Sequence, residues 1–155
     1  MEQIVFKVVL LIHIFGAIAG FGPVYAYGIL GPMAGRAGPN GIHYLEAIVG
    51  IEKRLTIPFA FIQPLSGLTL IFLAGLNTDF LQHYWLWTAI ILYALAFYLA
   101  LFRQTPAIER MIALAKAGPP TPEFMSLAQL TQRVGPITTV LLTLVIILMV
   151  TKPGP

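Results

Sequence analysis

Residue types that bind metals or carry charge are scarce in this chain. It has no cysteine, which excludes disulfides, iron–sulfur clusters, thiolate zinc sites and haem attached through a C-x-x-C-H motif. Only 10% of its 155 residues are charged, against about 25% in an average soluble domain, and 58% are hydrophobic. The mean hydropathy is +0.86. This balance excludes a soluble globular domain and predicts a small membrane protein.

Four apolar stretches are each about long enough to cross a bilayer, which takes about 20 residues. They cover residues 4–27, 55–76, 84–102 and 134–151. The first stretch lacks a basic n-region and a clear cleavage site, so we interpret it as a span and not as a signal peptide. The pattern predicts an all-α fold, a four-helix transmembrane bundle made by residues 1–155 as a single domain.

The three connections between these spans differ in character. Residues 31–41 are dense in glycine and proline, which predicts irregular structure. Residues 77–83 form a short link, so the second and third spans should be antiparallel neighbours. In the third connection, Thr105-Pro106 and Thr121-Pro122 each resemble an N-cap followed by proline at the first helical position. They predict two short amphipathic surface helices.

The basic residues predict the orientation in the membrane. Connections one and three carry seven of the nine: Arg36, Lys53, Arg54, Arg103, Arg110, Lys116 and Arg133. By the positive-inside rule, both termini face out and these two connections are cytoplasmic. We expect the cytoplasmic (inner) membrane of a prokaryote. Because the basic residues are scattered over span ends, they form no patch for nucleic acid.

The remaining charged groups and the prolines have structural interpretations. All six acidic residues map to span ends or connections, which disfavours transport of a charged species. We interpret the run Glu52-Lys53-Arg54 as an interfacial anchor. Pro58 and Pro64 are expected to kink the second span and to free carbonyls near its centre. Paired carboxylates, a serine with a histidine base and a phosphate-binding glycine loop cannot be assembled, so we predict no catalytic residue.

His13 is the main candidate for chemistry, because it is the only titratable side chain far from a span end. It shares a helical stripe with Gly16 and Gly20, and small residues at this spacing mark close helix packing, so it should face the bundle interior. The second span has a comparable stripe, formed by Thr56, Gln63 and either Ser66 or Gly67. His13 and Gln63 both fall near the midplane. We expect their side chains to hydrogen-bond across the two helices.

A cofactor role for His13 is the alternative. Neutral imidazole is a common ligand of b-type haem, and a glycine face leaves room for a flat ring. His83, near the start of the third span, is the second-ligand candidate, whereas His43 lies on the opposite side of the membrane. The methionines are dispersed, without an M-x-x-M or H-x-M cluster, so no copper or other metal site is predicted.

Three segments resemble a family of predicted integral membrane proteins, domain of unknown function 2269. They are Leu11-Ile12-His13-Ile14-Phe15-Gly16-Ala17, the stretch from Glu52-Lys53-Arg54 to Gln63-Pro64-Leu65-Ser66-Gly67-Leu68, and Leu148-Met149-Val150-Thr151-Lys152-Pro153-Gly154. That family is distantly similar to the copper-resistance D proteins and to HemJ-type protoporphyrinogen oxidases, four-helix proteins with a histidine in the first helix. The resemblance would make His13 the haem-linked histidine. The HemJ-type pattern also has a lysine in the third helix, and this chain has none between Trp85 and Phe102.

These observations favour a non-catalytic helical module, either self-associating or an accessory subunit of a membrane complex. The motivation is a polar-poor interior beside small-residue faces such as that of Gly16 and Gly20. The first alternative is a b-type haem or porphyrin-binding redox protein that uses His13. The second is a carrier for a small neutral or lipophilic solute, which requires an internal cavity at the level of Gln63. The expected partners are the lipid bilayer and further copies or other membrane subunits.

Overall fold

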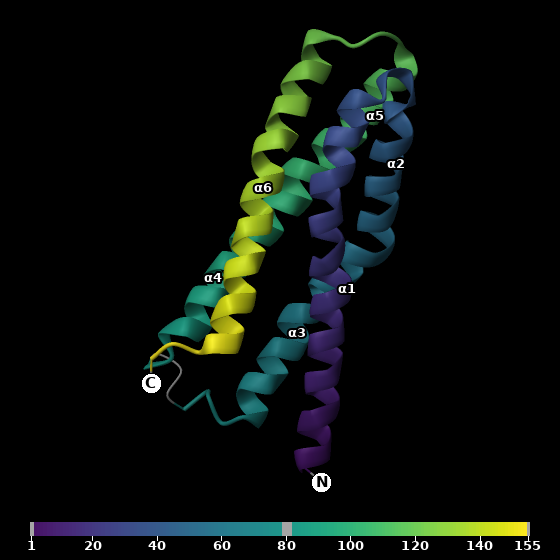
Figure 1. Ribbon diagram of the computed structural model, residues 1–155. Helices are drawn as coiled ribbons and strands as arrows, with labels where there is room; N and C mark the ends of the chain where they lie inside the picture. Colours follow the sequence, from purple (N-terminus) through teal and green to yellow (C-terminus); the bar gives the residue numbers. More distant parts are fainter. Residues whose placement is uncertain (1, 79–81, 155) are drawn as a thin grey trace.

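The computed structural model describes residues 2–78 and 82–154, and within them every regular element is helical. Four segments are long and apolar enough to cross a membrane: Glu2–Arg36, Gly38–Leu73, Tyr84–Ala117 and Pro122–Thr151. They run alternately up and down, so the chain is an all-α, four-helix bundle with four transmembrane-capable segments, as predicted (Figure 1).

Two of the four segments are composite helices. In chain order the elements are α1 (Glu2–Arg36), η1 (Gly38–Asn40), α2 (Gly41–Ile51), η2 (Glu52–Thr56), α3 (Ile57–Leu73), α4 (Tyr84–Leu99), η4 (Ala100–Gln104), α5 (Thr105–Ala117) and α6 (Pro122–Thr151). The elements η2 and η4 are π-helical turns that join α2 to α3 and α4 to α5 without a break.

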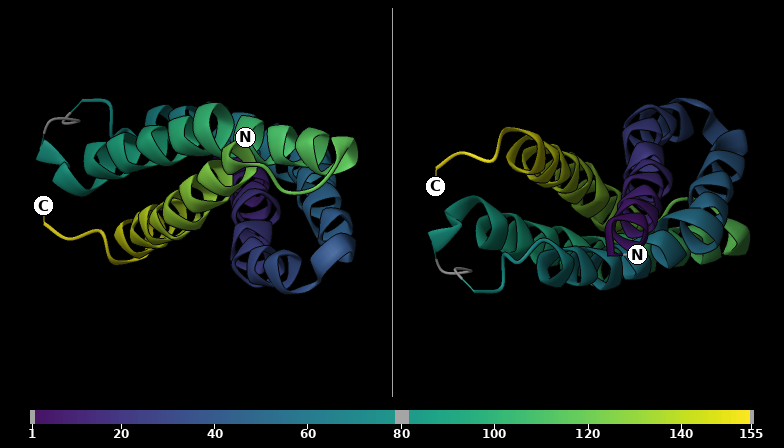
Figure 2. Two further views of the ribbon diagram at one scale, coloured as in Figure 1. Left: turned by 90° about the horizontal axis from the view of Figure 1, so that it is seen from above. Right: turned by 90° about the horizontal axis from the view of Figure 1, so that it is seen from below.

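The bundle has two recognisable ends. One of them, which we call the termini end, holds the start of α1, the end of α3, the start of α4 and the end of α6 (Figure 1). The elements α2 and α5 lie at the other, the α2–α5 end. Viewed along its length, α1 lies beside α2 and α3, while α4 pairs with α6 (Figure 2). The helices α3 and α4 are antiparallel and touch, as the short link predicts, with the rings of Phe61 and Phe97 5.1 Å apart.

The first connection is more regular than predicted. The helix α1 continues through Pro32 to Arg36, so the expectation of irregular structure over residues 31–41 was wrong for most of that stretch. Leu30 and Ala34 pack against the buried core, and Gly41 starts α2 directly against Ala34. Tertiary packing therefore outweighs the weak helix propensity of the glycines here.

The third connection is helical over the predicted residues, but it contains no separate surface helices. The stretch from Thr105 to Ala117 is α5, which continues the third span through η4. Thr121 caps the second stretch, accepting a hydrogen bond from the Phe124 backbone N–H at 3.2 Å, and this stretch is the beginning of α6 itself. The spans are consequently longer than their apolar centres.

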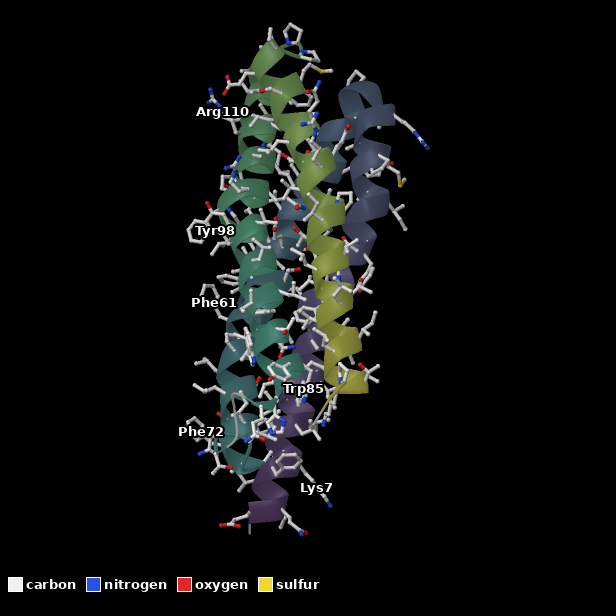
Figure 3. All side chains as sticks on the ribbon, turned by 90° about the vertical axis from the view of Figure 1, so that its left-hand side faces the viewer. Lys7, Phe61, Phe72, Trp85, Tyr98 and Arg110 are labelled. Atoms are coloured by element: carbon white, nitrogen blue, oxygen red, sulfur yellow. The ribbon has the colours of Figure 1, made fainter. Side chains whose placement is uncertain are left out.

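The main core joins all four segments. Its buried side chains are Phe21, Val24, Tyr27, Leu45, Ile48, Ala89, Ala96, Ile108, Met111, Leu141, Leu142 and Val145. Large apolar side chains also cover the outside, and Phe61, Phe72 and Tyr98 project outward with more than half of each exposed (Figure 3). An apolar outer surface of this kind suits contact with lipid.

Pro64, inside α3, leaves one backbone carbonyl that is bonded by a side chain of another helix. Proline has no backbone N–H, so it leaves the carbonyl of Ala60, four residues earlier, without its helical donor. The hydroxyl of Tyr93 on α4 donates to this carbonyl. The predicted free carbonyl near the centre of the second span therefore becomes a link between α3 and α4.

Candidate functional site

Buried polar side chains in the described part of the chain are Glu52, Thr56, Gln63, Ser66, Gln104, Thr105 and Thr138. Most of them fall into two groups. The first, here the helix-link cluster, consists of His13, Gln63 and Ser66. The second, here the π-segment junction, consists of Tyr27, Glu52, Thr56, Gln104 and Thr105.

The helix-link cluster ties α1 to α3. The His13 Nδ1 lies 2.8 Å from the Ser66 Oγ, and the Ser66 hydroxyl donates to the Ile62 carbonyl at 2.9 Å. In the amide orientation that gives both ends a partner, Gln63 accepts from the Ala17 N–H at 2.9 Å and donates to the His13 carbonyl at 3.0 Å. The structure thus brings His13 and Gln63 together and adds Ser66 to them.

Glycines make this close approach of α1 and α3 possible. A Cβ on Gly16 would lie 3.2 Å from the Gln63 amide, and one on Gly67 would lie 3.2 Å from the His13 Cε1. A Cβ on Gly20 would lie 3.4 Å from the Cβ of Phe59. The small-residue stripe of the first span is therefore filled by α3 of the same chain.

The packing of α3 against this glycine face affects the alternative in which His13 binds a haem. The glycine face that would take a flat ring is occupied by Phe59 and Gln63, and the His13 Nδ1 already has a partner in Ser66. These residues do not fit a haem held on this face. His83 lies at the residue before α4, with its ring 6.2 Å from that of Trp85, in a different group of side chains from His13. Within residues 2–78 and 82–154, no three His, Asp or Glu side chains gather to hold a metal ion.

The π-segment junction lies where the two composite helices face each other. The Glu52 side chain is 2% exposed, and its Oε1 accepts from the Thr105 hydroxyl at 2.8 Å. The hydroxyls of Tyr27 and Thr56 lie 2.9 Å apart and connect the junction to α1. Among the described residues, neither the Glu52 Oε2 nor the Oε1 of Gln104 has a hydrogen-bond partner.

Both π-helical turns contribute to this junction. Glu52 begins η2 and Thr56 ends it, whereas Gln104 ends η4 and Thr105 follows it. A π turn inserts an extra residue into a helix, which changes the direction of the side chains beside it, and such turns are frequent at functional sites. The two π turns are joined by the hydrogen bond between Glu52 and Thr105, so the junction is a candidate functional site.

Sequence reasoning assigned these residues to other roles. Glu52 is not part of an interfacial anchor: Lys53 and Arg54 are exposed, but successive helical residues differ by about 100°, so Glu52 turns inward. The prediction that all acidic residues lie at span ends or connections concerns position along the chain, and the structure adds that the Glu52 side chain is buried. One signal was available, because Glu52 and Thr56 extend the polar stripe of Gln63 and Ser66 by helical spacing.

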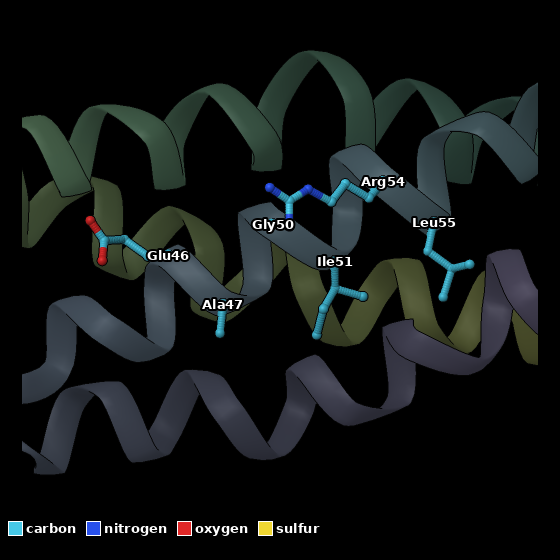
Figure 4. Close-up of a pocket in the computed structure, with 6 residues that line it drawn as sticks. All are labelled: Glu46, Ala47, Gly50, Ile51, Arg54 and Leu55. Carbon is cyan, nitrogen blue, oxygen red and sulfur yellow. The ribbon is translucent and has the colours of Figure 1, made fainter.

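Ion pairs at the surface flank the junction. Lys53 pairs with Glu109 between η2 and α5, and Lys116 Nζ lies 2.7 Å from a carboxylate oxygen of Glu46, between α5 and α2. Along α2 and η2 lies a shallow hollow lined by Glu46, Ala47, Gly50, Ile51, Arg54 and Leu55 (Figure 4). Glu52 does not line this hollow.

Comparison with known proteins shows a family match. The family model described as "Predicted integral membrane protein (DUF2269)" matches residues 7–153. No curated protein and no solved structure matches the chain.

Proposed function

Because the chain belongs to this family of predicted integral membrane proteins, we propose that it is a non-catalytic helical module that associates with a second copy in the bilayer. An accessory role toward a different membrane subunit is the other outcome that the experiment below distinguishes. In this proposal the helix-link cluster is structural, since its polar groups satisfy one another between α1 and α3.

The supporting observation is a second small-residue pair on α1. Gly22 and Ala26 are four residues apart and both are exposed, and nothing lies within 4 Å of a Cβ built on Gly22. Small residues at this spacing let two transmembrane helices approach closely. Unlike Gly16 and Gly20, which α3 covers, this pair is open to another helix.

Self-association is tested on the full chain in nanodiscs or mild detergent, by dilution-dependent energy transfer between labelled copies. Gly22→Leu should weaken association, whereas Ala94→Leu, at an exposed small residue of α4, should leave it unchanged. A strictly monomeric wild type with no partner in native pull-downs would overturn the proposal. A monomer that co-purifies with one other membrane protein would point to the accessory role.

An absorption spectrum of the purified protein separates this proposal from its cofactor alternative. We expect no Soret band. A Soret band that disappears in His13→Ala would instead indicate a haem or porphyrin protein.

The orientation in the membrane belongs to the same proposal. Seven of the nine basic residues lie from the end of α1 to η2 and from η4 to the first half of α6, which supports placing the α2–α5 end in the cytoplasm and both termini outside. Since the chain has no cysteine, single cysteines introduced at Gly118 and Gly154 report the side directly through an impermeant thiol reagent. Labelling of Gly118→Cys but not Gly154→Cys in intact cells would reverse the orientation.

A further inference from the structure

The Glu52 carboxyl lacks a compensating charge. Among the residues described, no cation forms an ion pair with it, and its neighbour Lys53 points outward to pair with Glu109. The titratable and charged groups around it are Tyr27 from α1 through Thr56, Lys53 from its own turn, and Glu109 from α5. An ionised carboxylate buried without a partner is costly, so the charge must be neutralised by something that binds there.

The hydrogen bonds of the Glu52 carboxyl indicate which group neutralises its charge. The Thr105 hydroxyl lies 2.8 Å from the Glu52 Oε1 and 2.9 Å from the Ala100 carbonyl. A threonine hydroxyl has one hydrogen to donate and can also accept. An ionised Glu52 would have one hydrogen-bond donor for its two charged oxygens, because nothing among the described residues donates to its Oε2. The Ala100 carbonyl already accepts the Thr105 backbone N–H, so the Thr105 hydroxyl can either donate to Glu52 or accept from a Glu52 carboxylic acid.

The structure also argues against a metal ion as the group that neutralises Glu52. A divalent metal ion would require more negative charge than the single carboxylate of the junction, and no cluster of His, Asp and Glu is present in the described parts of the chain. A monovalent ion such as Na⁺ or K⁺ would match one carboxylate, but it needs several further oxygen ligands, and among the described residues only the Thr105 hydroxyl bonds this carboxyl. A proton neutralises the single carboxylate and needs no further ligand.

We propose that Glu52 is a proton-binding site, occupied as a carboxylic acid when the bundle is closed. This goes beyond the proposed association and does not depend on it. When the O–H bond of Glu52 breaks, the proton passes to water that reaches the junction from the α2–α5 end, and a carboxylate remains. Release therefore requires the contacts between η2 and α5 to loosen, beginning with the exposed Lys53–Glu109 pair.

Infrared difference spectroscopy tests the bound proton directly. The full chain in lipid nanodiscs at neutral pH should show the carbonyl stretch of a protonated carboxyl, and this band should be absent in Glu52→Gln. The control Glu46→Gln, at an exposed and ion-paired carboxylate, should keep the band. In Thr105→Val the band should remain but shift, since the carboxyl has lost its hydrogen-bond partner. Absence of the band from wild type, or an unshifted band in Thr105→Val, overturns the proposal.

The pH dependence of unfolding gives an independent measurement. If the folded state keeps the proton and the unfolded state loses it, stability falls as pH rises, by up to tenfold in the unfolding equilibrium constant per pH unit. The neutral Glu52→Gln should fold and should lack this component of the slope. Equal slopes would overturn the proposal. Stabilisation of wild type by Na⁺ or K⁺ that is lost in Glu52→Gln would replace the proton by a metal cation.

Discussion

Replacing Gly41 by alanine tests how closely the first two helical segments approach. A Cβ at this position would lie 2.2 Å from the Ala34 carbonyl oxygen and 3.2 Å from its carbon. Real Cβ atoms essentially never come within 3.0 Å of another heavy atom, so the start of α2 would have to move by about 0.8 Å. The backbone at Gly41 is ordinary right-handed helix, with φ −58° and ψ −27°, so the cost is steric and not conformational.

The expected cost follows from two opposing effects. Overpacking costs about 1–3 kcal/mol, and contact with backbone, which cannot rotate away, favours the upper part of that range. Alanine in place of glycine returns up to about 1 kcal/mol of helix propensity. We therefore expect Gly41→Ala to lower the free energy of unfolding by about 2 kcal/mol.

Gly50, in the same helix, provides the matched control. Nothing lies within 4 Å of a Cβ built there, so Gly50→Ala should stabilise the protein by about 0.5–1 kcal/mol. Unfolding of both variants in lipid–detergent micelles with increasing SDS, followed by circular dichroism, gives the comparison. A Gly41→Ala variant at least as stable as wild type would refute the close contact between α1 and α2.

Two further substitutions probe hydrogen bonds between helices. Tyr93→Phe should lower the free energy of unfolding by about 1–2 kcal/mol, because the Ala60 carbonyl loses its donor. The Pro64→Ala background restores a backbone N–H for this carbonyl. In that background, Tyr93→Phe should shift the SDS midpoint of unfolding less. A double-mutant cycle of His13→Ala and Ser66→Ala should give a coupling of about 0.6 kcal/mol, typical of such contacts in membranes, and a coupling near zero would contradict the contact.

Most contacts of the helix-link cluster could be predicted from helical spacing in the sequence. His13 faces α3 because it lies on the small-residue stripe of α1, and the same helical spacing on the second span puts Gln63 and Ser66 on the facing side. Both helices are regular α-helices at this level, so a count of 100° per residue holds. The partner choice of Nδ1, Ser66, could not be predicted, because it depends on the distance and rotation between the two helices.

The contacts of the π-segment junction could not be predicted from helical spacing in the sequence. Thr105 has the sequence of an N-cap, yet the helix passes through it and its hydroxyl bonds Glu52, which lies 53 residues earlier in the chain. A cap and a continuing helix compete within a few kcal/mol, and packing between distant segments decides between them. A proline lies two residues after each π turn, Pro58 after η2 and Pro106 after η4, but a proline there fits the start of a new helix as well as a continuing one.

The sequence by itself determined the membrane class, the four spans and their alternating direction. The physical reason is that a bilayer offers no hydrogen bonds, so any apolar run of this length must form a helix to satisfy its own backbone. The tertiary structure alone decided that α1 continues to Arg36, that α3 fills the face of Gly16 and Gly20, and that Glu52 turns inward. Each of these depends on which surfaces of distant helices meet, and that is set by packing across the bundle.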